Sequence, residues 1–546
     1  MRFVDAISRL PFLLALLSPP AAGVSQTADD SQQDRAVSGQ VVNSVTGQPI
    51  AGALVQIGGE HAMLTDHEGQ FEFHDVAGPF WGMTAATKPG YFPAQPAVMT
   101  LSRPGHEYQG AITLKLVPEA IIFGKALDPS SQPLQGLRVQ LKRLDVRDGL
   151  RHWQQVQSTT TSVEGEFRFF ELEAGKYSLF TSFQIDGQPD QASAVAFSPV
   201  VYPPPNGPSL GGPSSSGNEG LSITAGDHVE ANLNPPSQTL YPVTGHIEGP
   251  AAQGVVFEAQ SSSGGIIRPV VRFNRFSGDF RLLMPSGSYH LKVHAFFQGE
   301  QLFATREISL GEAPLKNISI TPAPLATVPV EIEYQAGSPS SAEMQPPPPS
   351  IANIGLEETD PSGSDRTFNS QPAQPSNSPG DSLVIRGLEP GEYRLVARPP
   401  PPLYLASAVC GVLDLRRDPM TIAGSGAGCT IHAVLRNDSA TLNWSVNGKS
   451  QGSTGKQIFV YALPLDNFIQ SMNMASAEEQ GSGDVQEGSL EGLAPGRYLV
   501  MALDHAEDLP YREPDLMQRY LSEGKEITLT AKGKSEVQLD VVAGEP

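Results

Sequence analysis

Apolar and polar residues alternate along most of the chain, and one such stretch occurs five times. In Glu164–Phe180, "EGEFRFFELEAGKYSLF", Phe167 and Phe169 precede a Gly-centred turn, and Tyr177 and Leu179 follow it. Alternation with a period of two is typical of a strand with one buried face, so each copy predicts a β-hairpin. An aromatic residue two positions after the turn glycine recurs roughly every 100 residues, about the size of one sandwich domain. These aromatic residues are Phe80, Tyr177, Tyr289, Tyr393 and Tyr498.

The segments around each predicted hairpin carry the same strand-like pattern. Val37–Gly59 predicts two strands joined by a turn, Ala120–Leu144 repeats this arrangement, and each unit closes with another alternating stretch. Short strands separated by Gly and Pro turns are typical of β-sandwiches. We therefore predict an all-β fold of about five tandem Ig-like or transthyretin-like β-sandwich domains.

A single stretch near the C-terminus follows a helical pattern instead. In Glu513–Gly524, the residues Leu516, Tyr520 and Leu521 recur at helical spacing, and Gly524 is a typical helix stop. We predict a short helix near 513–523, and we expect it to cover an open edge of the last sandwich.

Composition sets the predicted boundaries, because tracts rich in Pro, Ser and Gly cannot bury enough apolar surface to fold. The predicted organisation is a signal peptide at 1–23, a disordered leader at 24–35, sandwich 1 at 36–118, sandwich 2 at 119–236 with a Pro/Gly/Ser-rich insertion at 202–220, sandwich 3 at 237–324, sandwich 4 at 325–437 with a disordered insertion at 335–380, and sandwich 5 at 438–546.

The N-terminus predicts export. Leu10–Leu17 is an apolar run too short to span a bilayer, and Ala21 and Gly23 suit a cut after Gly23. We expect a periplasmic, outer-surface or secreted protein. Since no later stretch is apolar for long enough, we expect no integral membrane segment. The formal net charge of −22 disfavours nucleic acid as a partner, because the two would repel each other.

The chain contains two cysteines, Cys410 and Cys429, and both lie in the predicted sandwich 4. In an oxidising compartment such a pair is expected to form a disulfide bond. Two free buried thiols are the alternative.

The first unit carries a motif that resembles a known domain family. The matching positions are Gly39 in the first strand, Thr46–Ala53 ("TGQPIAGA") and Thr65–Phe73 ("TDHEGQFEF"). They resemble the carboxypeptidase regulatory-like domain, a seven-stranded transthyretin-like sandwich grouped with starch-binding and collagen-adhesin folds. The resemblance covers the first two units well and the others in part. It implies a surface or periplasmic protein with a binding and scaffolding role.

We predict no enzymatic activity, no cofactor and no metal site. A zinc carboxypeptidase needs a His-x-x-Glu pair, and none of the eleven His residues has Glu three positions later. The segment around Ser425 lacks the spacing of a serine-hydrolase elbow, and Gly448–Lys456 lacks that of a phosphate loop. Collagen-adhesin relatives sometimes form a Lys–Asn isopeptide bond, and in unit two Lys125 with Asn232 or Asn234 leaves this alternative open.

Binding is the remaining class of function. Sandwiches present ligands on end loops or on an open face, often with exposed aromatic residues. The candidates here are Phe80, Trp81, Tyr91 and Phe92, followed by Trp153 and Trp444. We predict a non-enzymatic exported binding or scaffolding protein whose partner is an envelope or extracellular protein. The first alternative is a carbohydrate-binding protein that uses these aromatics to hold a polysaccharide. The second is an accessory module for a peptidase or an outer-membrane transporter.

Overall fold

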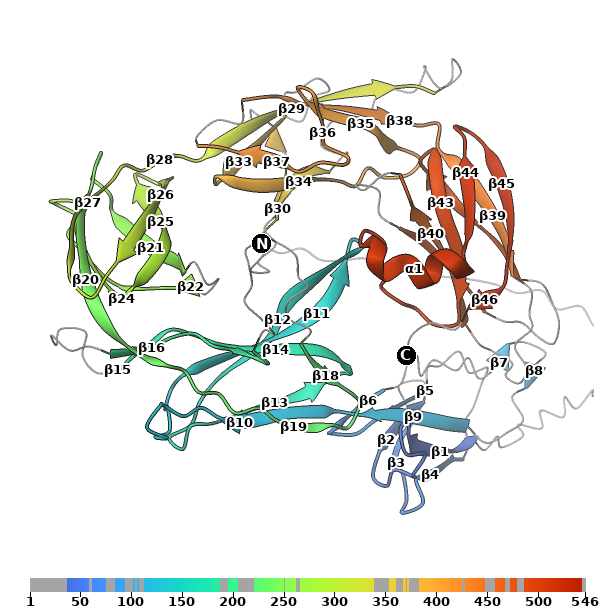
Figure 1. Ribbon diagram of the computed structural model, residues 1–546. Helices are drawn as coiled ribbons and strands as arrows, with labels where there is room; N and C mark the ends of the chain where they lie inside the picture. Colours follow the sequence, from blue (N-terminus) through green and yellow to red (C-terminus); the bar gives the residue numbers. More distant parts are fainter. Residues whose placement is uncertain are drawn as a thin grey trace, which may run out of the picture. The chain divides into compact units, whose positions relative to one another are not determined.

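The computed structural model shows a chain built almost entirely of β-strands (Figure 1). Five hydrophobic cores each lie between two sheets. The predicted fold class of about five tandem sandwiches is therefore confirmed. The chain divides into two compact units, residues 1–118 with sandwich 1 and residues 119–546 with sandwiches 2 to 5. The described residues are 37–57, 61–74, 84–93, 102–103, 106–107, 112–186, 195–204, 220–249, 251–261, 266–337, 353–359, 367–369, 371–372, 383–424, 428–446, 457–466, 472–478 and 486–542.

Sandwich 1 packs a sheet of order β4-β1-β9-β6 against a sheet of order β3-β2-β5. β1 pairs with β4 antiparallel and with β9 parallel. The strands are β1 (Val37–Asn43), β2 (Leu54–Ile57), β3 (His61–Leu64), β4 (Gln70–Phe73), β5 (Thr84–Thr87), β6 (Tyr91–Pro93) and β9 (Ile112–Pro118), with the separate pair β7 (Ser102–Arg103) and β8 (His106–Glu107). The predicted signal peptide and leader lie outside the described residues.

Sandwich 2 repeats this plan, with β13-β10-β19 facing β12-β11-β14-β17 and with β18 paired to β14. Again the first strand, β10, has an antiparallel and a parallel neighbour. The strands are β10 (Ala120–Lys125), β11 (Arg138–Arg147), β12 (Leu150–Thr160), β13 (Glu166–Leu172), β14 (Gly175–Thr181), β17 (Val201–Tyr202), β18 (Leu221–Ile223) and β19 (His228–Glu230).

Sandwich 3 includes two strands, β15 and β16, whose residues were predicted to belong to sandwich 2. One sheet of sandwich 3 has the order β15-β16-β20-β24-β23, and β16 pairs with β20 in it. β27 also pairs with β20. The second sheet has the order β22-β21-β25-β26-β28. Ala196 packs there against Leu240 and Leu283. The strands are β15 (Gln184–Asp186), β16 (Val195–Phe197), β20 (Ser237–Ile247), β21 (Gly254–Ser261), β22 (Ile266–Ile267), β23 (Val270–Phe273), β24 (Asp279–Pro285), β25 (Gly287–Phe297), β26 (Glu300–Leu310), β27 (Leu315–Ile320) and β28 (Ala323–Pro324).

In sandwich 4, the prediction that the whole tract 335–380 is a disordered insertion is wrong, because the tract contains strands of the sandwich. Within that tract, β30 pairs with β34 and buries Ile354 and Leu356 in the core. The Pro- and Ser-rich surroundings concealed its short apolar alternation. The sheets are β32-β33-β29-β38-β35-β36 and β31-β30-β34-β37. The strands are β29 (Ala326–Gln335), β30 (Ile354–Glu358), β31 (Thr367–Asn369), β32 (Gln371–Pro372), β33 (Leu383–Leu388), β34 (Gly391–Ala397), β35 (Tyr404–Cys410), β36 (Leu413–Asp414), β37 (Met420–Ile422) and β38 (Ile431–Arg436).

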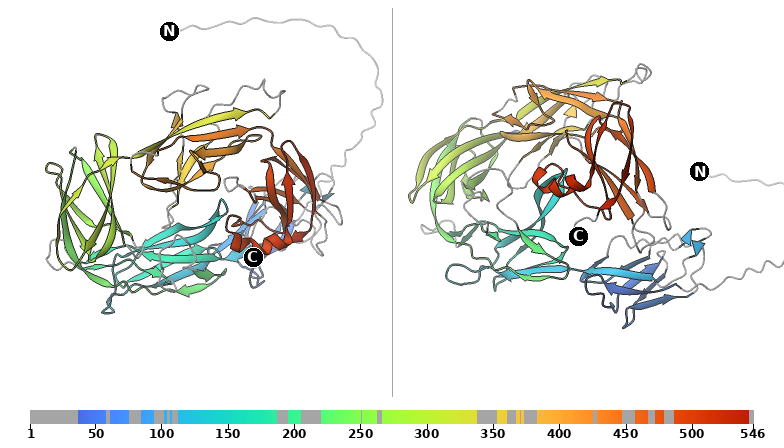
Figure 2. Two further views of the ribbon diagram at one scale, coloured as in Figure 1. Left: turned by 45° about the horizontal axis from the view of Figure 1, so that its top comes forward. Right: turned by 45° about the vertical axis from the view of Figure 1, so that its right-hand side comes forward.

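Sandwich 5 carries α1 (Pro514–Glu523), which agrees with the predicted helix but lies over a sheet face (Figure 2). The expectation that it covers an edge is wrong, because Met517 and Tyr520 pack on the outer side of β43, whose continuous apolar run needs cover on both faces. The sheets are β42-β39-β45 and β41-β40-β43-β44, with β46 on β43. The strands are β39 (Ala440–Val446), β40 (Gln457–Pro464), β41 (Asn473–Glu478), β42 (Gln486–Leu493), β43 (Gly496–Leu503), β44 (Lys525–Leu529), β45 (Lys534–Leu539) and β46 (Val541–Val542).

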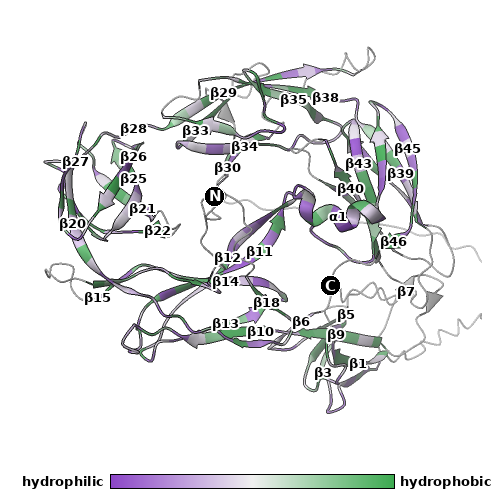
Figure 3. Cartoon of the chain, in the orientation of Figure 1, coloured by the Kyte–Doolittle hydropathy of each residue, from purple (hydrophilic) through white to green (hydrophobic). Residues whose placement is uncertain are grey.

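In all five recurring stretches, the described strands before and after the turn belong to opposite sheets of the sandwich, so the prediction of hairpins is wrong. In sandwich 2, β13 and β14 belong to opposite sheets, and the same holds for β24 and β25 in sandwich 3. Gly175 and Gly287 cross between the sheets with φ of 159° and 154°, a region that glycine reaches without strain. Alternation shows which side of a strand is buried (Figure 3), and this is the same whether the next strand pairs with it or faces it across the core.

The aromatic residue after this crossing anchors the second strand in the core. The hydroxyl groups of Tyr177, Tyr393 and Tyr498 each donate a hydrogen bond to the carbonyl oxygen four residues earlier, at 2.8, 2.9 and 2.8 Å. All three side chains are buried. Burial also raises the pKa of the Tyr177 hydroxyl. The tyrosine therefore satisfies a backbone group at the point where the chain changes sheets.

A buried threonine joins the two halves of the family-like motif. In sandwich 1, Thr65 Oγ1 donates to the Ile50 carbonyl and accepts from the Ala53 N–H. In sandwich 2, Thr161 repeats both bonds with Leu134 and Leu137. The threonine, which follows the third strand of the sandwich, thus fixes the turn that precedes the second strand.

Thr161→Val should destabilise sandwich 2 by about 1–3 kcal/mol, because two buried backbone groups lose their partner at nearly constant side-chain volume. Hydrogen exchange of the β10 and β13 amides measures this. Thr160→Val is the matched control, since Thr160 is the exposed neighbour. Equal exchange in the two variants would contradict the assignment.

Candidate functional site

A groove of about 880 Å³ lies on the outer face of the β13-β10-β19 sheet in sandwich 2. The three strands supply its floor, and the end of β12 with the following turn supplies one wall. The lining includes Ile121, Phe123 and Lys125 of β10, Glu166 and Arg168 of β13, and His228 and Glu230 of β19.

Strand periodicity places an aromatic ring in the middle of this face. Ile122 and Phe167 point into the core, so Phe123 and Arg168 point outward. In the register of the sheet, Phe123 lies opposite Arg168 on one side and Glu230 on the other. The Phe123 side chain is therefore an apolar centre between a cation and an anion.

Charges of both signs surround Phe123. Lys125 Nζ lies 2.9 Å from Glu166 Oε1, and the hydrogen bond and charge of this carboxylate raise the pKa of Lys125. Glu230 accepts a hydrogen bond from Asn232. Arg168 is exposed and has no salt bridge among the described residues. Such a surface can hold an extended polypeptide by apolar contact with Phe123 and by polar contacts along its rim.

Lys125 does not have the surroundings of an isopeptide bond, so that alternative is wrong for the described residues of unit two. Its side chain is 52% exposed and binds Glu166. Asn232 Oδ1 accepts from the backbone N–H of Lys125 at 2.9 Å, and Asn234 is exposed. An isopeptide reaction needs a buried lysine beside the amide carbon, with a neutral amine that can attack it.

Only part of the predicted aromatic site lies among the described residues. Tyr91 and Phe92 lie in β6, where Tyr91 packs against the core of sandwich 1 and Phe92 lies opposite Val117. Lys88 Nζ lies 5.9 Å from the centre of the Tyr91 ring. Phe80 and Trp81 lie outside the described residues, so their role in carbohydrate binding stays a prediction.

The other two tryptophans differ in their surroundings. Trp444 is buried in the core of sandwich 5, opposite Gly488. Trp153 is half-buried on β12, and its ring covers Gly220. Trp444 therefore acts in packing and leaves no face for a ligand.

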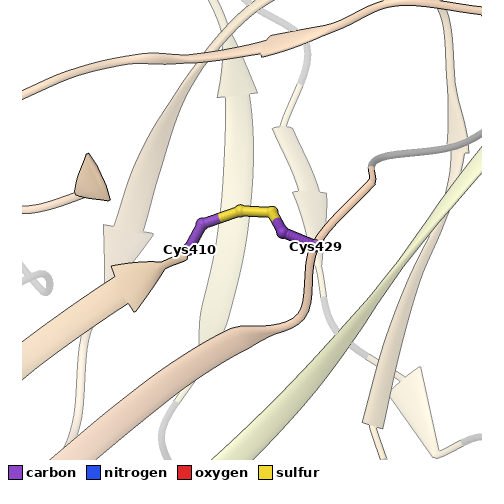
Figure 4. The surroundings of a disulfide bond; sticks show 2 residues. All are labelled: Cys410 and Cys429. Atoms are coloured by element: carbon purple, nitrogen blue, oxygen red, sulfur yellow. A yellow bond between two sulfur atoms is a disulfide. The ribbon is translucent and has the colours of Figure 1, made fainter. Parts of the chain in front are cut away.

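The predicted disulfide between Cys410 and Cys429 is present (Figure 4). Their Cα atoms are 5.7 Å apart, within the usual range for a disulfide. Cys410 ends β35 and Cys429 precedes β38, so the bond lies beside the core of sandwich 4.

Sequence reasoning missed the groove residues, although one signal was available. Phe123 and Phe170 occupy outward positions of their strands, where polar residues are expected, and both are exposed. The sequence did not indicate that Arg168 and Glu230 lie beside Phe123, because the tertiary fold decides which strands pair with β10.

In the described ranges, no group of His, Cys, Asp and Glu side chains is arranged to hold a metal ion. The helix of the described part has ten residues, and no described helix combines the length and hydropathy needed to cross a membrane.

Comparison with known proteins finds likeness to several bacterial proteins of solved structure, among them pilins. A streptococcal ancillary pilin is 12% identical and covers 55% of this chain and 98% of its own, with a TM-score of 0.19. The Bacillus anthracis TIE protein is 10% identical over 75% of this chain and 68% of its own, with a TM-score of 0.14. The major pilin subunit of Bacillus cereus is 12% identical over 58% and 99%, with a TM-score of 0.13. TM-scores this low carry no functional inference. No family model and no curated protein matches the chain.

Proposed function

We propose that this chain is an exported, non-enzymatic binding and scaffolding protein built of carboxypeptidase regulatory-like domains. Its groove on sandwich 2 binds an extended segment of an envelope or extracellular protein. The family assignment is supported by the motif residues of sandwich 1, where Gly39 lies on β1 opposite Phe71 of β4 and Thr65 joins the two motif halves. Export is supported by the apolar run Leu10–Leu17.

The observation that carries the binding function is the exposed Phe123 at the centre of the groove. An aromatic ring on a sheet face, with Arg168 and Glu230 beside it, offers an anchor for an apolar side chain and charged groups that orient its backbone. The mixed charges suit a polypeptide, whose side chains carry both signs.

Phe123→Ala should reduce binding of selected peptides at least about tenfold, as expected for truncation of a central aromatic anchor. The experiment selects phage-displayed random peptides on the chain from Val24 and measures their affinities for the variants. Phe296→Ala is the matched control, because Phe296 is 40% exposed on a strand of sandwich 3 and Phe123 is 39% exposed.

Peptides that bind wild type and Phe296→Ala but lose affinity for Phe123→Ala support the groove. Equal affinity for all three proteins would contradict it. A glycan array run in parallel tests the carbohydrate alternative. Saturable glycan binding without any selected peptide would overturn the proposed function.

A further inference from the structure

The β11–β12 hairpin of sandwich 2 reaches residues far away in the sequence. Its strands have ten and eleven residues, and the two-residue turn Asp148-Gly149 joins them with φ of 49° and 77°. Asp-Gly with both φ values positive is the turn that matches the twist of a hairpin. The tip of this hairpin, Arg147–Arg151, lies beside the segment that leads into α1 (Figures 1 and 2).

Sandwich 5 holds the tip by charge and by backbone bonds. Glu513 accepts hydrogen bonds from the backbone N–H of Arg151 at 2.8 Å and from its Nε at 3.1 Å, and Nη2 lies 3.0 Å from the same carboxylate. The Arg512 N–H donates to the Gly149 carbonyl at 2.9 Å. Tyr511 lies so close that a Cβ at Gly149 would be 2.6 Å from its ring. A side chain at position 149 is therefore incompatible with this contact.

Sandwich 4 holds the same tip from its own side. Arg398 donates to Asp148 at 2.7 Å, and Arg147 Nη2 lies 3.9 Å from Glu357. The tip thus presents two cations and one anion, and each is paired with an opposite charge from sandwich 4 or 5.

The segment of sandwich 5 that receives the tip is itself anchored. Leu509, Met517 and Tyr520 pack on the outer face of its sheet. The Tyr520 hydroxyl donates to Glu507 at 2.6 Å, and the Glu507 N–H donates to the Tyr461 hydroxyl at 2.7 Å. The Glu513 carboxylate is therefore presented by an ordered segment.

We propose that the β11–β12 hairpin is a releasable strap that fastens sandwich 2 to sandwiches 4 and 5. Its contacts include three ion pairs, two hydrogen bonds from backbone N–H groups and the ring of Tyr511. The Arg151–Glu513 pair is its centre, because both side chains are mostly shielded, with 27% and 21% exposed. Along the chain, sandwiches 2 and 5 are connected only through sandwiches 3 and 4. The strap restricts the movement of sandwich 2 relative to sandwich 5. A rise in ionic strength loosens the strap first at the Arg147–Glu357 and Arg398–Asp148 pairs, whose arginine side chains are 55% and 56% exposed, since salt weakens exposed ion pairs.

Arg151→Glu should raise the hydrogen-exchange rate of the tip amides at least about tenfold, and it should increase the radius of gyration in solution scattering. The charge swap Arg151→Glu with Glu513→Arg should restore both values toward wild type. The experiment uses the chain from Val24. Arg497→Glu is the matched control, because Arg497 forms equally close ion pairs with Asp466 and Glu526 inside sandwich 5.

Exchange in β13 and β14 reports whether sandwich 2 stays folded. If Arg151→Glu unfolds it, Tyr511→Ala tests the strap from the opposite side and should open the tip alone. The proposal would be overturned if the hydrogen-exchange rate of the tip amides and the radius of gyration stayed unchanged in both Arg151→Glu and Tyr511→Ala. A charge swap that fails to restore protection would do the same. These readouts do not depend on the groove, so the strap and the proposed function can fail separately.

Discussion

Gly245→Ala should destabilise sandwich 3 by at least about 3 kcal/mol, a large effect for a single added methyl group. A Cβ at this position would lie 2.0 Å from the Ile318 carbonyl oxygen and 2.6 Å from the Phe280 ring. The carbonyl belongs to β27, the parallel neighbour of β20, so relief requires the two strands to separate. Hydrogen exchange of the β20 and β27 amides measures the loss.

Gly254→Ala is the control in the same sandwich. Gly254 lies on β21, its φ is not positive, and a Cβ there would meet nothing within 4 Å. We expect a change within about 1 kcal/mol, since the added methyl group mainly restricts the unfolded chain. If both variants exchange alike, close packing at Gly245 does not limit the stability of the sandwich.

The Gly245 environment recurs in sandwiches 1 and 2, which explains why glycine is needed there. Gly39 lies opposite Phe71 and Gly124 opposite Phe167, each at the first strand between its antiparallel and parallel neighbours. Sandwich 5 exchanges the two residue types, with Trp444 on the first strand and Gly488 opposite. The ring fills the space that the missing side chain leaves, whichever strand supplies it.

Asp438→Ala should destabilise the junction of sandwiches 4 and 5 by about 1–3 kcal/mol at pH 7, because the buried Tyr404 hydroxyl loses its acceptor and Arg436 loses its ion pair. Asp438 Oδ1 accepts from the Tyr404 hydroxyl at 2.8 Å and from Arg436 Nε at 3.0 Å, and Oδ2 accepts from Arg436 Nη2. Its carbonyl accepts from the Lys532 N–H of sandwich 5. Exchange of the β38 and β39 amides measures the effect.

The effect of Asp438→Ala should depend on pH in one direction. Burial opposes ionisation of Asp438, but the hydrogen bonds from Tyr404 and Arg436 outweigh it and hold the pKa below the ordinary value. The stabilisation by the carboxylate is therefore present above the unfolded pKa near about 4 and is lost as the pH falls through the folded pKa. The difference between wild type and variant should shrink in acid.

Asp466→Ala is the control for Asp438→Ala, because Asp466 pairs with Arg497 on the surface and should cost no more than about 1 kcal/mol. An equal loss in both variants, or a difference that grows as the pH falls, would contradict the assignment of Asp438.

The groove was hidden from sequence reasoning for a physical reason. The register of β10 with β13 and β19 places Arg168 and Glu230 beside Phe123, although these residues lie 45 or more positions away. The predicted aromatic candidates came from exposed-looking loops, and Tyr91 instead packs on the core of sandwich 1. Among the described residues, the groove that we propose for binding lies on a sheet face.

Local pattern in the sequence determined the all-β class, the repeat of about five sandwiches, the position of α1 and the Cys410–Cys429 pair. Each of these depends on which side of a segment is buried or on residues close in the chain. Tertiary structure alone decided that the recurring strands face each other across the core, that β15 and β16 join sandwich 3, and that the β11–β12 tip lies against Glu513. The physical reason is that periodicity reports burial, whereas hydrogen-bond partners and ion pairs between distant segments are set by how the sheets pack.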